Sequence, residues 1–117
     1  MSYSNGDVWK LDEDDLVAHV RGSSADSSKV WKKHWEKMTG RKFPSKCKIQ
    51  GCGKLAKVGA HVYVKYNRQN WIIPACTTCN RDGIHDYDSK DDDCWVSINY
   101  DTVAVWVPTH DNTREYY

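Results

Sequence analysis

The stretch that decides the fold runs from Cys47 to Asn80 and reads CKIQGCGKLAKVGAHVYVKYNRQNWIIPACTTCN. Its four cysteines form two close pairs, Cys47 with Cys52 and Cys76 with Cys79. Such spacings let a tight turn bring two thiolates to one side of an ion, and both are typical of structural zinc sites. The pattern predicts one structural Zn²⁺ held by the four cysteines. A redox-active pair at Cys76 and Cys79 is the alternative.

The size and composition of the chain favour a single small domain that needs such a metal. It has 117 residues, of which 39% are hydrophobic, with six Trp and seven Tyr. A core of this kind is modest and built on large rings. Zinc binding by thiolates contributes on the order of 10 kcal/mol to the folding of small domains. Cys94 stands apart from the two pairs, and we expect it to be a buried apolar residue.

Cellular location is indicated only by what the chain does not display. The N-terminal segment MSYSNGDVWK has no apolar run of the kind found in signal peptides, and no stretch is apolar enough to span a bilayer. We therefore expect no membrane association and an intracellular protein, cytoplasmic or nuclear. A secreted protein whose leader has been removed is the alternative.

Charge is distributed very unevenly along the sequence. The net charge is +1, yet the segment from Lys29 to Arg68 holds 12 Lys and Arg residues against a single acid, Glu36. Most of the acids lie in the two flanks, including the run from Asp86 to Asp93. Such separation predicts a basic face on the folded protein.

The periodicity predicts an α+β domain over residues 1–117. The N-terminal part, 1–45, is expected to contain two helices, one from Asp12 to Arg21 and one from Ser28 to Thr39. Residues 46–85 are expected to form the zinc-binding core. The segments CWVSINY and TVAVWVP favour a C-terminal β-hairpin over 94–108 that turns at Asp101.

A strand is expected at AHVYVKY within the zinc-binding core. Its residues alternate, so that Ala60 and Val62 share one face while His61, Tyr63 and Lys65 share the other. We expect the second set to face outward.

The order of these parts resembles the HNH endonuclease core. The likeness rests on CKIQGC, then GAHV, then NWIIPACTTCN. It implies a treble-clef zinc fold in which a zinc knuckle, a β-hairpin and a short helix surround a catalytic metal. By position, His61 matches the general base of that family and Asn70 its middle asparagine.

Two residues depart from the HNH pattern. The family usually holds its catalytic metal with an acid or histidine just before the base and with a histidine after the second cysteine pair. Ala60 and Asn80 occupy those places here. A histidine base alone contributes only about 10²–10⁴-fold to a reaction rate. The resemblance therefore predicts an HNH-like core without cleavage activity.

The leading functional hypothesis is a zinc-stabilised module that binds nucleic acid, DNA rather than RNA, through a basic and aromatic face. Two alternatives remain open. One is a module that binds a protein partner, as a small inhibitor or effector, through its charge-separated surface. The other is a metal-dependent HNH nuclease that uses His61 as general base and a second divalent metal. The predicted nucleic-acid contacts are Lys57, Tyr63, Lys65, Arg68 and Arg81.

Overall fold

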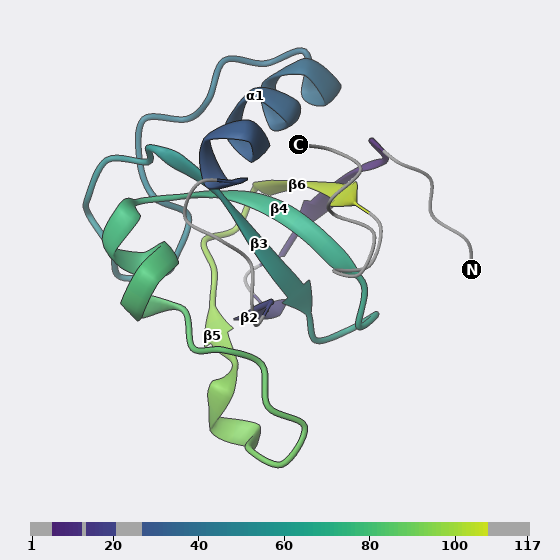
Figure 1. Cartoon of the computed structure of the whole chain (residues 1–117), viewed down its shortest axis with the longest axis vertical. Coiled ribbons are helices and arrows are strands. Elements are labelled where there is room, and N and C mark those ends of the chain that lie inside the picture. The colour runs from purple at the N-terminus through teal and green to yellow at the C-terminus, as the bar shows by residue number, and fades with distance from the viewer. Residues whose placement is uncertain (1–5, 13, 21–26, 108–117) are drawn as a thin grey trace.

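The computed structural model describes residues 6–12, 14–20 and 27–107, with only the backbone described at 27–29. Its six strands form one antiparallel sheet in the order β1-β6-β4-β3-β2-β5, and helix α1 packs against it (Figure 1). The predicted α+β class is confirmed. The elements in chain order are β1 (Val8–Leu11), β2 (Leu16–His19), α1 (Ser27–Thr39), β3 (Val58–Val64), β4 (Asn70–Ala75), a π-helical turn (Cys79–Gly83), a 3-10 turn (Asp92–Cys94), β5 (Val96–Ser97) and β6 (Thr102–Val107).

Two apolar clusters flank the central strands. Alternate residues of a strand point to opposite faces of the sheet, and nearly every residue of β3 and β4 is buried. On one face, Val62 and Trp71 join a cluster that includes Cys47, Cys76 and Cys79. On the other face, Ile72 packs with the tryptophans of α1. Strands buried on both faces lie in the middle of a sheet, and β3, β4 and β6 do so here.

Helix α1 confirms the helix predicted from Ser28 to Thr39. Trp31 and Trp35 recur at helical spacing, and both are buried. The Nε1–H group of Trp35 donates a hydrogen bond of 2.8 Å to the carbonyl oxygen of Val103 in β6. The helix comes closest to β3 at Gly59, where a Cβ atom would lie 2.7 Å from the backbone carbon of Trp31. This close approach requires glycine.

The predicted helix from Asp12 to Arg21 is wrong. Strand β1 ends just before Asp12, β2 follows from Leu16 to His19, and Arg21 lies outside the described residues. The N–H of Asp12 donates to Oδ2 of Asp15, and the N–H of Asp15 donates to the carbonyl of Asp12. Aspartates that suit a helix start also suit a turn. Pairing of the flanking strands with β6 and β3 then decides the structure.

The predicted C-terminal hairpin over 94–108 is also wrong in its pairing. The turn at Asp101 is present, with a positive φ of 64°. However, β5 pairs with β2, whereas β6 pairs with β1 and β4. Five of the six residues of β6 are buried, so this strand has two apolar faces and takes a central place. A two-residue strand such as β5 cannot cover it.

The treble-clef layout is not supported. Strands β3 and β4 do pair, but they lie in the middle of a six-stranded sheet and do not form a separate hairpin around the metal. The π-helical turn that begins at the second cysteine of the second pair spans only Cys79–Gly83. Among the described residues, no helix combines the length and the apolar character needed to cross a membrane.

Candidate metal centre and basic groove

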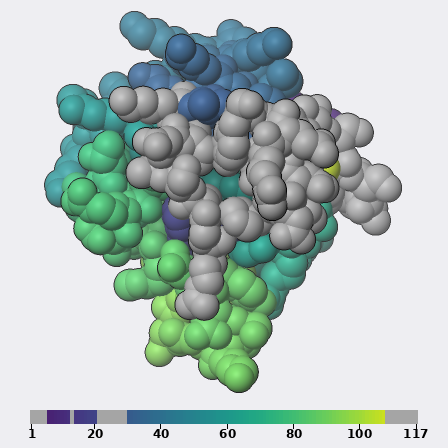
Figure 2. All heavy atoms as spheres, viewed as in Figure 1, coloured from purple at the N-terminus to yellow at the C-terminus, as the bar shows by residue number. Residues whose placement is uncertain are grey.

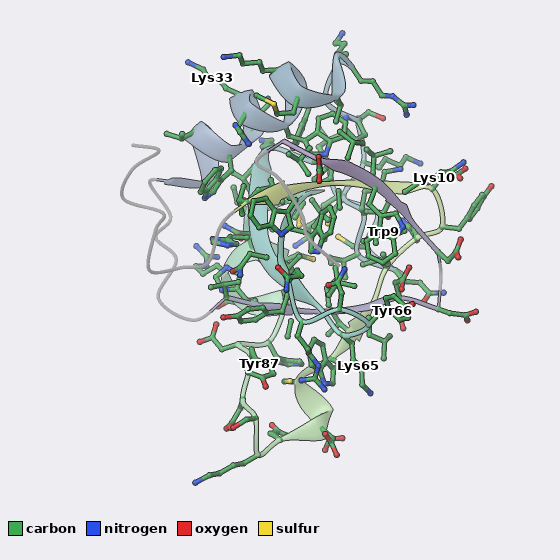
Figure 3. The ribbon with its side chains drawn as sticks, turned by 90° about the vertical axis from the view of Figure 1, so that its right-hand side faces the viewer. Trp9, Lys10, Lys33, Lys65, Tyr66 and Tyr87 are labelled. Carbon is green, nitrogen blue, oxygen red and sulfur yellow. The ribbon has the colours of Figure 1, made fainter. Side chains whose placement is uncertain are left out.

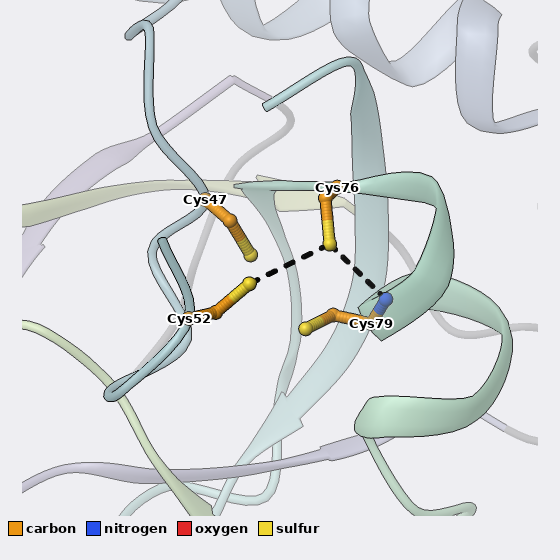
Figure 4. A group of neighbouring side chains, drawn as sticks. All are labelled: Cys47, Cys52, Cys76 and Cys79. Carbon is orange, nitrogen blue, oxygen red and sulfur yellow. Dashed lines mark hydrogen bonds between the residues drawn. The ribbon is translucent and has the colours of Figure 1, made fainter. Parts of the chain in front are cut away.

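The four predicted metal ligands converge at one point (Figure 4). The Sγ atoms of Cys47, Cys52, Cys76 and Cys79 all lie within 4.8 Å of one another. Those of Cys52 and Cys76 are 3.7 Å apart. A tetrahedral ion with Zn–S bonds of about 2.3 Å would separate neighbouring sulfurs by roughly 3.8 Å. The cluster therefore has the composition and the size of a tetrahedral thiolate site that could hold a metal ion.

A knuckle formed by residues 46–55 supplies the first cysteine pair. An antiparallel bridge between Lys46 and Leu55 closes it. Inside it, the N–H of Cys47 donates to the carbonyl of Lys54 at 3.0 Å. Gly51 has a φ of +83°, a conformation that side chains rarely adopt, and it allows the turn into Cys52.

The end of β4 and the turn after it supply the second pair. Cys76 follows the last residue of β4, and Cys79 begins the π-helical turn. The N–H of Cys79 donates to Sγ of Cys76 at 3.3 Å. A Cβ atom at Gly83 would lie 3.0 Å from Sγ of Cys79. The absent side chain at Gly83 therefore leaves room for the Cys79 sulfur.

The thiols differ in acidity when no ion is bound. Burial raises the pKa of Cys47, and burial together with hydrogen bonding to neighbouring thiols raises the pKa of Cys79. Burial also acts to raise the pKa of Cys76. The Cys79 N–H and the neighbouring thiols outweigh this effect by hydrogen bonding, so the pKa of Cys76 is lowered. Cys76 is thus the favoured first thiolate, and a bound cation must displace the remaining protons.

His61 lies in the interior, so its predicted outward orientation is wrong. Its exposed fraction is 2%, and its ring meets Trp31 of α1 edge-on at 5.7 Å. Its Nε2 atom lies 3.0 Å from Oδ1 of Asn70. A general base must come within hydrogen-bond reach of the group it deprotonates. With α1 packed over His61, the nuclease hypothesis has no support in the described residues.

Three of the five predicted nucleic-acid contacts gather around the β3–β4 turn. The Arg68 guanidinium lies 5.0 Å from the ring centroid of Trp95, and Lys65 Nζ lies 5.9 Å from the same centroid. Tyr63 contacts Tyr87 at 5.1 Å between centroids. Figure 3 shows Lys65 and Tyr87 close together, far from Lys33 on α1. These contacts hold the segment 85–95 against β3, and both cations already lie against rings.

The other two predicted contacts lie elsewhere. Arg81 is on the π-helical turn, where its Nε atom pairs with Asp82 at 3.0 Å. Lys57 precedes β3 and lines a surface hollow of about 310 Å³ together with Lys32 and Lys42. The predicted set is therefore divided among three places.

A second hollow of about 150 Å³ adjoins the first, because Lys42 and Pro44 line both. The two hollows together form what we call the basic groove. Its cations come from α1, from the connection after it and from the knuckle and its continuation into β3: Lys32, Arg41, Lys42, Lys48 and Lys57. Within the part of the chain that the structure describes, none of these five forms an ion pair.

The two carboxylates that line the groove are already engaged. Glu36 Oε2 accepts a hydrogen bond from the N–H of Phe43 at 3.2 Å. Asp101 Oδ1 pairs with Lys10 Nζ at 2.8 Å. Among the described residues, neither carboxylate lies within ion-pair distance of the five cations, so the groove lining holds five positive charges against two negative ones. Sequence reasoning predicted a basic face but identified only Lys57 of this set, since the hollows arise from segments that meet only in the folded chain.

The acidic loop, residues 85–95, lies away from this groove. Figure 2 shows it, in green to yellow-green, at the opposite end of the molecule from the blue helix α1. Its exposed acids are Asp86, Asp88, Asp91, Asp92 and Asp93. The uneven charge of the sequence thus becomes an uneven charge in space.

Sequence reasoning missed a polar cluster next to the metal centre. His19 in β2 has Nδ1 3.2 Å from Oδ1 of Asp86 and Nε2 3.2 Å from Oδ1 of Asn80. The backbone N–H of His19 also donates a hydrogen bond to the carbonyl oxygen of His85. Both ring nitrogens are engaged, so the cluster ties β2 to the segment after Cys79. The sequence around His19 does not predict this cluster, because the partners of His19 lie more than 60 residues later in the chain.

Comparisons of the chain with protein-family models, with curated proteins and with solved structures found no match. Function is therefore inferred from the geometry of the site.

Proposed function

We propose that the chain is a zinc-stabilised module that binds nucleic acid through the basic groove and does not cleave it. The observation that supports binding is the set of five cations, without described ion pairs, that line two adjoining hollows. Clustered Lys and Arg side chains without acidic partners are the electrostatic footprint of proteins that contact phosphates. The buried position of His61 supports the absence of cleavage.

Zinc is the metal that best suits the four cysteines. Four thiolates in a tetrahedral arrangement select zinc or an iron–sulfur centre, and a closed site without an open position is typical of structural zinc. The knuckle that supplies Cys47 and Cys52 also carries Lys48, and the chain after it carries Lys57. The metal would thus fix part of the groove wall and take no part in chemistry.

The proposed nucleic-acid-binding site lies at a different place from the one that the sequence favoured. Lys57 stays in it, whereas Lys65 and Arg68 are next to the acidic loop and lie over Tyr87 and Trp95. Negative charge near a phosphate contact opposes binding. We therefore assign Lys65 and Arg68 to holding the loop, and phosphate contact to the groove.

Binding to labelled DNA and RNA over a series of salt concentrations tests this proposal. We expect log K to fall linearly with log salt, and each groove lysine that is removed should reduce the slope by about 0.7–0.9. Lys57→Gln and Lys42→Gln are the test variants. Lys33→Gln is the matched control, because Lys33 is exposed on α1 and lines neither hollow. Binding that does not depend on salt, or that falls equally in the control, would refute the proposal.

A further inference from the structure

We propose that the groove takes single-stranded nucleic acid and that one unpaired base enters the larger hollow. This inference rests on the proposed function and adds the class of nucleic acid that the groove fits. It is carried by the combination of apolar and cationic side chains that line the larger hollow.

Apolar side chains form part of the lining of the larger hollow. Phe43 and Pro44 line it from the connection after α1, and Leu55 lines it from the knuckle. Leu55 is a large apolar side chain with an exposed fraction of 61%. Lys32, Lys42 and Lys57 add three cations to the lining from three separate segments, against the single carboxylate of Glu36. Lys32 Nζ lies 5.3 Å from the centroid of the Phe43 ring, which fixes one of these charges at the wall.

An unpaired nucleotide has the same division of chemistry. Its base offers a flat apolar face and its phosphate a negative charge, and proteins that bind single strands combine ring or apolar contacts with a cationic groove. The hollow of about 310 Å³ holds roughly ten water molecules at ~30 Å³ each, which leaves room for one base. Water on the apolar part of the lining would be released when the base enters.

A duplex does not complement this shape. Its bases are stacked inside the helix, so only phosphates and sugars would reach the hollow, and the exposed Leu55 side chain would gain no apolar contact. A single strand can place a base against the apolar side chains and its phosphates beside the lysines at the same time. The groove should therefore prefer unpaired nucleotides.

The second hollow extends the path of the strand. It shares Lys42 and Pro44 with the larger hollow and adds Arg41 and Lys48. The adjoining hollows thus offer several cations to a backbone that carries one charge per nucleotide. An acidic peptide would meet this path only with carboxylates at matching intervals, so nucleic acid is the favoured occupant.

Oligonucleotides that lack bases test the inference directly. We would measure the binding of a short oligothymidylate, of the same strand with abasic residues, and of the matching duplex. The abasic strand keeps every phosphate and loses only the bases. We expect the normal strand to bind roughly 5–100-fold more tightly than the abasic strand, and more tightly than the duplex.

Two variants assign this difference to the hollow. Leu55→Ser should remove most of the preference for the normal strand over the abasic strand while the salt dependence stays. Tyr66→Ser is the control, because Tyr66 is the most exposed of the large apolar residues in the described part of the chain, at 79%, and lies at the β3–β4 turn. It should leave the preference unchanged, and loss of the preference in Tyr66→Ser but not in Leu55→Ser would overturn the assignment.

The remaining outcomes separate the two proposals. Equal binding of normal strand, abasic strand and duplex, with the expected salt dependence, would overturn base insertion and leave phosphate binding intact. No binding of any oligonucleotide would overturn both. Binding of a glutamate-rich peptide with one leucine, in the absence of oligonucleotide binding, would also overturn both and assign the groove to a protein partner.

Discussion

The Sγ atoms of Cys52 and Cys76 lie 3.7 Å apart, although the two residues are 24 positions apart in the chain. One belongs to the knuckle and the other follows β4, so the contact joins a surface turn to the centre of the sheet. Without a metal, the half-buried thiol of Cys52 and the buried thiol of Cys76 are joined by one S–H···S hydrogen bond. A bound ion would convert it into a strong cross-link.

The chain should therefore bind one metal ion and depend on it for stability. We expect one zinc per chain by native mass spectrometry, and none in Cys76→Ser. Structural zinc contributes about 10 kcal/mol or more to small domains, so chelation should lower the free energy of unfolding by several kcal/mol. Urea denaturation with and without a chelator measures this. Cys94→Ala is the control, because Cys94 lies outside the cluster and its loss should leave the metal content unchanged.

Gly59→Ala should destabilise the fold by about 1–3 kcal/mol, because the added methyl group would meet the backbone of Trp31 and the side chain of Ile72. Denaturation midpoints at equal zinc saturation measure the effect. Gly53→Ala is the matched substitution, since no atom lies within 4 Å of its added Cβ. Equal stability of the two variants would mean that α1 does not approach β3 as closely as described.

The metal centre could be predicted from the sequence because cysteine spacing reports local geometry. Two residues between Cys76 and Cys79, or four between Cys47 and Cys52, suffice to place each pair on one side of an ion. Helix α1 could also be predicted from the sequence, because its buried tryptophans recur at helical spacing within one element. Both features depend on residues that are close in the chain.

The sheet order and the groove could not be predicted in the same way. The alternation in β3 correctly separates Val62 from His61, but it cannot tell which face is covered, and α1 buries the face that carries His61. Strand β6 has two apolar faces and thus pairs with distant β1 and β4, not with its neighbour β5. The groove requires three segments to meet, and only the folded chain brings Lys32 near Lys57.

Arg68→Gln should affect mainly the stability of the fold, whereas Lys57→Gln should affect mainly oligonucleotide binding. Arg68 lies over Tyr87 and Trp95, and an exposed cation–π contact is worth about 0.5–1 kcal/mol. Its loss should lower stability slightly and leave oligonucleotide affinity nearly unchanged. Lys57→Gln should leave stability unchanged and reduce the salt slope for a single strand by about 0.7. A loss of oligonucleotide affinity in Arg68→Gln, with an unchanged salt slope in Lys57→Gln, would place the binding site at the β3–β4 turn.

His34 should make the fold less stable in mild acid. Burial lowers the pKa of His34, and the nearby charge of Lys37 lowers it further. The unfolded chain then takes up a proton more readily than the folded one, so stability falls as the pH drops through the unfolded pKa of about 6.5. His34→Gln should reduce this loss between about pH 7.5 and about pH 5.5. Urea midpoints of both proteins at saturating zinc measure it, and parallel curves would contradict the assignment.

Metal removal should weaken oligonucleotide binding, because the knuckle builds one wall of the groove. The bridge between Lys46 and Leu55 depends on the turn that the metal would fix, and the N–H of Lys57 donates to the carbonyl of Ala75, just before Cys76. Release of the ion should loosen Leu55 and Lys57 together. We therefore expect chelation to lower the affinity for oligothymidylate by at least about tenfold and to remove the preference over the abasic strand. Fluorescence anisotropy before chelation, after chelation and after the return of zinc measures this, with circular dichroism to follow the sheet. Unchanged affinity in the metal-free protein would mean that the groove does not depend on the metal for its shape.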